Sequence, residues 1–102
     1  MAGVMKFGDA TFQNGIQCTV RRGIGWAGAA GEIKAIDAFD QDLGNIYVKY
    51  TQVMRFKDIP IAVLSCEHIG KTSLDKLLLI MWDCYNGFNR QEIVTIVWFT
   101  KE

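Results

Sequence analysis

The chain has 102 residues, and its 11 Lys and Arg side chains balance 11 Asp and Glu, so the formal net charge is zero. Apolar residues make up 50% of the sequence, which excludes a disordered chain and predicts one folded domain over residues 1–102. The charge balance excludes a uniformly basic protein that coats nucleic acid, but it allows a local basic patch.

Four strands are predicted. Residues 16–21 form a short extended run, and residues 32–39 alternate between apolar and polar side chains. A turn rich in Asp, Asn and Gly at residues 40–45 leads into a second alternating run at residues 46–56, which predicts a hairpin. Residues 92–100 are β-branched and aromatic throughout, so we expect a central strand covered on both faces.

Two helices are predicted before the last strand. The apolar residues of segment 74–85 recur at three- and four-residue steps, which predicts an amphipathic helix with a core-facing stripe. Thr72 and Asp75 resemble a capping box at its start. A shorter helix is predicted over residues 58–64, with Pro60 in its first turn. This order predicts an α+β fold, a small, mostly antiparallel β-barrel with two helices packed at one side.

The three cysteines are Cys18, Cys66 and Cys84. Their odd number and wide spacing are not typical of a disulfide framework or a zinc site, so we expect reduced thiols, no metal and no cofactor. The N-terminus lacks a signal segment, and the longest apolar run is far shorter than the roughly 20 residues of a membrane helix. These features predict a cytoplasmic protein without a membrane partner.

A first candidate site lies where the first predicted strand enters a glycine-rich loop at residues 23–31. Alternation places Thr19 and Arg21 on one face, and Arg22 follows directly. A hydroxyl beside a guanidinium can hold an anion or a base edge, but a solvated strand end whose arginine pairs with a surface carboxylate fits equally. Trp26, within the loop, suits base stacking or closure of the end of a small barrel.

A second candidate site is Cys66-Glu67-His68, between the two predicted helices. A carboxylate beside an imidazole can orient or charge it, which favours proton-transfer chemistry. One histidine and one cysteine do not supply the three or four ligands of a metal site. The alternative is a helix-end glutamate and a surface histidine without a chemical role. Tyr85, near the end of the long helix, is a further candidate for stacking on a base.

Taken in order, these motifs resemble an ASCH domain of the PUA-like superfamily, over residues 7–99. That family has a Gly-containing turn and a strand ending in Thr-x-Arg, which Thr19 and Arg21 match. It also has a long strand that ends in an Arg-Phe-x-Asp-Ile segment, as residues 55–59 do here. The other matches are Gly31-Glu32 before a strand, Glu67 and Ser73-Leu74 at the start of the helix, Tyr85 near its end, and residues 94–99, shifted by one position, as the closing strand.

The resemblance implies a small β-barrel with a cleft between barrel and helices, and a module that binds RNA or a nucleotide. Arginines in this cleft would neutralise phosphate, and Glu67 would accept a hydrogen bond from the exocyclic amine of cytosine or adenine. The expected cleft residues are Thr19, Arg21, Arg22, Trp26, Glu67 and Tyr85.

One branch of the family is similar to small amidohydrolases that deacylate acetylated cytidine with a Lys, a Thr and a Glu. The resemblance assigns Thr19 and Glu67 to two of these roles. The lysine is expected near Ile16, which cannot titrate, although Lys34 or Lys71 could supply an amine. This gap favours binding over hydrolysis. The amidohydrolase is the first alternative, and a protein-interaction accessory domain is the second.

Overall fold

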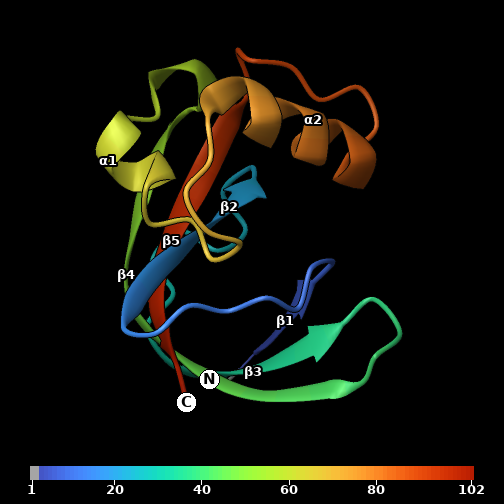
Figure 1. Cartoon of the computed structure of the whole chain (residues 1–102), viewed down its shortest axis with the longest axis vertical. Coiled ribbons are helices and arrows are strands. Elements are labelled where there is room, and N and C mark those ends of the chain that lie inside the picture. Colours follow the sequence, from blue (N-terminus) through green and yellow to red (C-terminus); the bar gives the residue numbers. More distant parts are fainter. Residues whose placement is uncertain (1–2) are drawn as a thin grey trace.

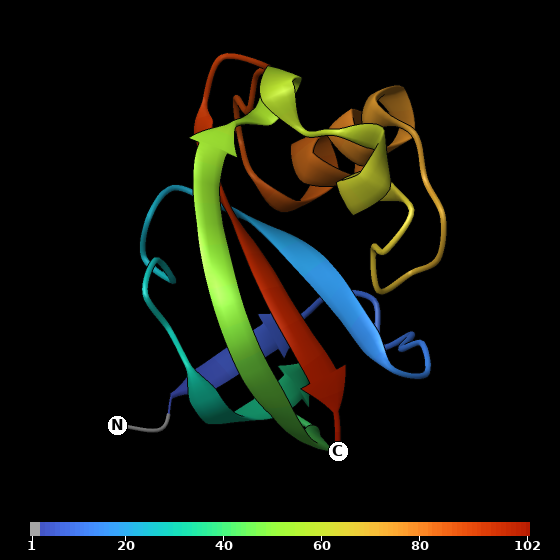
Figure 2. The ribbon, with the colours of Figure 1, turned by 90° about the vertical axis from the view of Figure 1, so that its left-hand side faces the viewer.

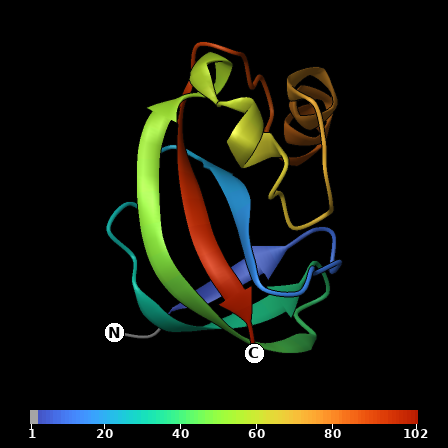
Figure 3. The ribbon, with the colours of Figure 1, turned by 60° about the vertical axis from the view of Figure 1, so that its left-hand side comes forward.

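The structure is a computed structural model that describes residues 3–102. A strongly curved sheet carries the helices beside one end of β5 and β2, while β1 and β3 lie at the other end (Figures 1 and 3). The elements in chain order are β1 (Val4–Phe7), β2 (Ile16–Arg22), β3 (Gly31–Asp37), β4 (Asp42–Arg55), the 3-10 helix η1 (Phe56–Asp58), α1 (Ile61–Leu64), α2 (Leu74–Cys84) and β5 (Ile93–Lys101).

The sheet is mixed, with the strand order β1-β3-β4-β5-β2. β1 runs parallel to β3, whereas the other neighbouring pairs are antiparallel. The edge strands β1 and β2 are not joined by a ladder within residues 3–102, so the sheet is a half-barrel. The prediction of a mostly antiparallel barrel is therefore wrong. Its source is β1, which the sequence analysis missed because four residues are too few to establish a period.

The curl of the sheet follows from the long strand β4 and two irregularities in its ladders. β4 has 14 residues and pairs with both β3 and β5. The register shifts between Ala35 and Ile36 in β3, and again between Val48 and Tyr50 in β4. Bulges of this kind bend a strand and increase its twist. β4 therefore curves from the β3 end of the sheet to the helix end (Figure 2).

Two apolar clusters lie on the two faces of the sheet, and β5 contributes to both. Ile96 and Trp98 pack toward the helices, whereas Val97 and Phe99 pack inside the curl. All four are 9% exposed or less, which confirms the predicted central strand covered on both faces. The helix-side cluster includes Leu77, Leu78 and Met81 of α2, and the inner cluster includes Met5, Phe7, Ile33, Ala35, Ile46 and Val48.

Both predicted helices are present, with corrected boundaries. α2 begins one residue later than the capping box suggested, because the Ser73 hydroxyl accepts the N-terminal hydrogen bond from the Lys76 N–H at 3.2 Å. The shorter predicted helix is divided into η1 and α1, with Pro60 as the N-cap of α1. The predicted hairpin is confirmed as β3 and β4, although β4 already starts at Asp42.

No helix within residues 3–102 is long and apolar enough to cross a membrane. In the same part of the chain the three cysteines are free, with Cys18 buried, Cys66 half-buried and Cys84 exposed. Burial raises the pKa of the Cys18 thiol far above its ordinary value, so this thiol is a packing residue rather than a nucleophile.

Candidate functional site

The outer edge of β2 is covered by the segment that joins α1 to α2. The Cys18 N–H donates to the Cys66 carbonyl and the His68 N–H donates to the Cys18 carbonyl, both at 2.8 Å. These two hydrogen bonds form a single parallel bridge between Cys18 and Glu67, and they give partners to backbone groups at the edge of β2. The bridge also fixes Glu67 and His68 beside the half of β2 that carries Thr19 and Arg21.

A cavity of about 280 Å³ lies between this edge of β2, the chain that follows β1, the Glu67 segment and α2. Thr19, Arg21, Glu67 and Tyr85, all candidates from the sequence, line it together. Part of the wall comes from one face of α2, where Leu77, Ile80, Met81 and Cys84 recur at three- and four-residue spacing.

Arg22 and Trp26, which we expected in the same cleft, do not line this cavity. Alternation turns Arg22 to the opposite face from Arg21, where its Nε pairs with Glu92 Oε1 at 2.6 Å. Trp26 packs against the inner apolar cluster of the half-barrel, because burying its large apolar surface there is favourable. The composition of the expected cleft is corrected accordingly: one arginine remains in it and the indole does not.

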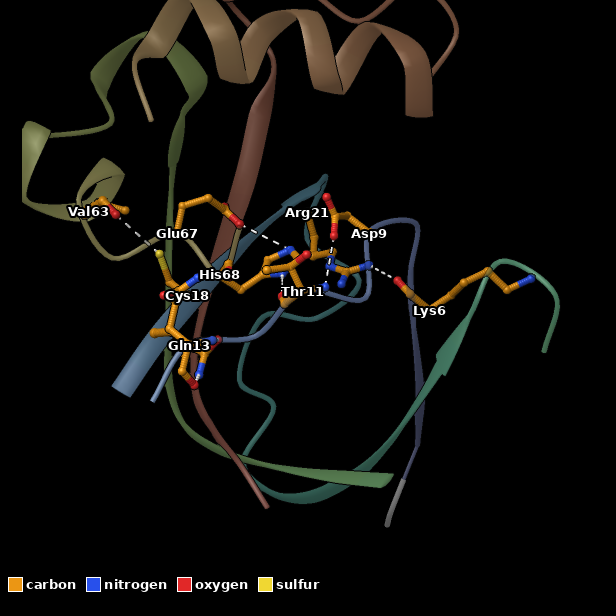
Figure 4. Close-up of polar contacts among 10 residues, drawn as sticks. Lys6, Asp9, Thr11, Gln13, Cys18, Arg21, Val63, Glu67 and His68 are labelled. Atoms are coloured by element: carbon orange, nitrogen blue, oxygen red, sulfur yellow. Dashed lines mark hydrogen bonds and ion pairs between the residues drawn. The ribbon is translucent and has the colours of Figure 1, made fainter. Parts of the chain in front are cut away.

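Glu67 and His68 are both buried, and their side chains contact each other (Figure 4). The Nδ1 atom of His68 lies 2.8 Å from the Thr11 carbonyl oxygen, which can only accept, so Nδ1 carries a hydrogen. The Nε2 atom lies 3.2 Å from Glu67 Oε1. One further proton therefore lies between these two atoms, either on the carboxyl group or on the imidazole.

Burial decides where this proton resides. Desolvation raises the pKa of Glu67 from 4.5 to about 7, against the opposing effects of the backbone N–H groups of His68 and Ile69 and the charge of Arg21. Desolvation also lowers the pKa of His68, whereas its hydrogen bond to Thr11 opposes this. Both directions favour neutral forms. Between the lowered pKa of His68 and about pH 7, the pair is thus a carboxylic acid that donates to a neutral imidazole.

Arg21 reaches across the gap between the two edge strands. Its Nη1 donates to the Lys6 carbonyl, and its Cζ lies 4.5 Å from the centre of the Phe7 ring (Figure 4). Its Nε is buried without a hydrogen-bond partner within residues 3–102. No carboxylate of that part of the chain forms an ion pair with it, although Asp9, Glu67 and Asp83 also line the cavity.

Several wall residues escaped the sequence analysis. Phe7, Gly8 and Asp9 belong to β1 and the chain just after it, a region without a recognised period. The α2 wall had a usable signal, since residues four positions apart along an amphipathic helix share a face. That face was interpreted only as core.

No family model matches the sequence, and no curated protein matches it. Among solved structures, the fold is similar to the crystal structure of protein EF3133 from Enterococcus faecalis V583, of family DUF984. The TM-score is 0.65 at 15% sequence identity, and the match covers 100% of this chain and 76% of that chain. At this identity the similarity shows the fold alone, an α+β half-barrel with two helices.

Proposed function

We propose that this chain is a nucleobase-binding module of the ASCH type within the PUA-like superfamily, and that it takes one base of an RNA or of a nucleotide into the cavity beside Glu67. The observation that carries the proposal is a carboxyl group that is 3% exposed and titrates near pH 7 in the wall of a small cavity. Perturbed acids of this kind cluster at functional sites.

The size of the cavity supports a base or nucleoside. About 280 Å³ lies near the lower end of the roughly 300–1,000 Å³ typical of small-molecule pockets. Leu77 and Met81 supply apolar wall, and Tyr85 supplies an aromatic ring. Thr19 and Glu67 supply the few polar groups that fix a ligand's orientation.

Glu67 favours bases that carry an exocyclic amine. When its acidic hydrogen is directed at His68, the carboxyl group retains lone pairs that can accept from an amine. Cytosine and adenine present an amine beside a ring-nitrogen acceptor on their Watson–Crick edges, and guanine presents an amine beside an N–H. Uracil presents carbonyls and no amine there. A carbonyl opposite an acceptor leaves both groups unsatisfied, which weakens binding.

Titration calorimetry with the four ribonucleosides at pH 6.5 tests this proposal. We expect cytidine or adenosine to bind more tightly than uridine, and the Glu67→Ala substitution to weaken that binding by about tenfold or more, the value of one hydrogen bond to a charged or strongly polar group. Glu92→Ala is the matched control, because it removes an ion-paired glutamate outside the cavity. Absence of nucleoside binding, or equal losses in the two variants, would contradict the proposal.

The shared proton of Glu67 and His68 favours one alternative, a small amidohydrolase, because an acid that titrates near neutrality suits general acid–base catalysis. Among residues 3–102, no lysine lines this cavity. Ile16 is 51% exposed and does not line it, and neither do Lys34 and Lys71. Arg21 lines it but retains its proton, so it cannot act as a base.

We therefore expect no useful hydrolysis of acetylated cytidine. Loss of one member of a cooperating catalytic set commonly lowers the rate by several orders of magnitude. Chromatography of reactions with the wild type, Glu67→Ala and Thr19→Ala measures this directly. Robust wild-type deacylation that both substitutions abolish would show that another group replaces the lysine and that the chain is an enzyme.

A further inference from the structure

A second cavity of about 300 Å³ adjoins the first. Gly8, Arg21, Cys84 and Tyr85 line both cavities, so the two spaces meet at these residues. Lys6 of β1 and Ala38, just after β3, complete the second cavity. In Figure 4 the Lys6 side chain extends away from the guanidinium of Arg21.

The two cavities differ in the charge of their walls. Asp9, Glu67 and Asp83 line the first cavity, together with Arg21. No acidic residue of the described chain lines the second cavity, whose charged residues are Lys6 and Arg21. A ligand with hydrogen-bond donors at one end and a negative charge at the other would match both walls.

Arg21 supplies the strongest reason to expect an anion. Arg21 is half-buried, and a partly desolvated cation is costly unless it is paired. Its contacts with the Phe7 ring and the Lys6 carbonyl compensate only in part. Its Nε remains a buried donor without a partner within residues 3–102. Guanidinium groups bind phosphate oxygens through their N–H donors, so a phosphate beside the Nη atoms would neutralise the charge of Arg21.

Lys6 is a second cation that is available to bind a phosphate together with Arg21. Its Nζ pairs with Asp40 at 3.3 Å, but the two side chains are 57% and 77% exposed. Ion pairs with this exposure contribute little to stability, so Lys6 can exchange Asp40 for a phosphate at small cost.

We propose that the second cavity holds a phosphate group of the ligand, so that the protein prefers a nucleoside phosphate, or a nucleotide within RNA, to a free nucleoside. This inference rests on the proposed function, because the base in the first cavity sets the position of the phosphate. It adds Lys6 and the second cavity to the site.

Calorimetry at 50 mM salt with cytidine, adenosine and their 5′- and 3′-monophosphates tests the inference. We expect at least one monophosphate to bind about tenfold more tightly than its nucleoside, the value of a charge-assisted hydrogen bond. This advantage decreases at 300 mM salt because the charges are screened. The dinucleoside monophosphate CpA, whose phosphate is a diester, distinguishes an RNA backbone from a free nucleotide as the source of the phosphate.

Lys6→Gln should reduce the advantage of the monophosphate over its nucleoside about threefold or more. Lys34→Gln is the matched control, because Lys34 also pairs with an exposed aspartate of the same sheet, Asp42 at 3.2 Å, and lines neither cavity. Equal affinity for nucleosides and monophosphates, or the same loss in both lysine variants, overturns the phosphate subsite and leaves base binding intact. If no nucleoside and no nucleotide binds, the proposed function falls as well.

Discussion

Replacing Phe7 by alanine is expected to lower the free energy of unfolding by about 3–5 kcal/mol, the range for deleting a buried aromatic ring. Phe7 is 1% exposed, and its ring centre lies 5.1 Å from those of Phe12 and His68 and 5.8 Å from that of Phe99. The substitution leaves a void that this dense environment cannot fill. The loss is a large share of the roughly 5–15 kcal/mol that stabilises a typical domain.

Urea unfolding followed by tryptophan fluorescence measures the effect. Phe39→Ala is the matched control: Phe39 is 85% exposed just after β3, so its loss should stay within about 0.5 kcal/mol. Phe7→Leu, which largely preserves the packed volume, gives a second measurement if the alanine variant fails to fold, and should cost less than the alanine variant. A cost below about 1 kcal/mol for Phe7→Ala would mean that β1 does not pack into the half-barrel.

Phe7 also marks the limit of what periodicity reveals about the fold. β5, the β3–β4 hairpin and α2 were predictable because each carries a long pattern within one contiguous segment. β1 was not, since its partner β3 is parallel and the two are separated by all of β2 and the glycine-rich loop. Without β1, the remaining strands resemble an antiparallel barrel, and the open, mixed sheet cannot be inferred.

The same distinction explains which parts of the candidate site were predictable. Thr19, Arg21, Glu67 and Tyr85 were singled out by residue type and by resemblance, and they line one cavity. Their proximity depends on the bridge between Cys18 and Glu67, a contact of one residue pair that no sequence pattern indicates.

Arg22 and Trp26 illustrate the opposite error. Both side chains suit a nucleotide cleft and lie close in sequence to the residues that line it. Arg22, however, lies on the other face of β2. The indole of Trp26 is more stable against the inner cluster than in solvent. Lys6, in contrast, lines the second cavity although nothing in the sequence distinguishes it from other exposed lysines.

The Glu67→Gln variant is expected to become more stable than the wild type as the pH rises, by about 3 kcal/mol at pH 8. The pKa of Glu67 is raised from 4.5 to about 7 by burial, so between these values the folded protein holds a proton that the unfolded chain has released. The contribution of Glu67 to wild-type stability therefore decreases as the pH rises through this interval and levels off above it. At about 1.4 kcal/mol per pH unit, the interval corresponds to about 3 kcal/mol.

His68 acts in the opposite direction and obscures this effect in the wild type alone. Burial lowers its pKa in the folded state below the ordinary 6.5, so its contribution to stability is lost as the pH falls through the lowered value and increases as the pH rises toward 6.5. Comparison with Glu67→Gln separates the two, because His68 is present in both proteins. A glutamine amide can also donate to His68 Nε2 as the carboxylic acid does, without being able to ionise.

Urea unfolding of both proteins from pH 4.5 to pH 8 measures the difference. We expect the difference in the free energy of unfolding between the two proteins to be nearly constant near pH 4.5. Between pH 5 and pH 7 it should shift steadily in favour of Glu67→Gln. Asp58→Asn, which neutralises an exposed carboxylate on η1, is the control and should follow the wild type across that interval. A difference that stays constant from pH 4.5 to pH 8, or a wild type that is the more stable protein at pH 8, would place the shared proton on His68. Glu67 would then be a carboxylate throughout, and guanine, which presents two adjacent N–H donors, would replace cytosine and adenine as the base that the cavity suits.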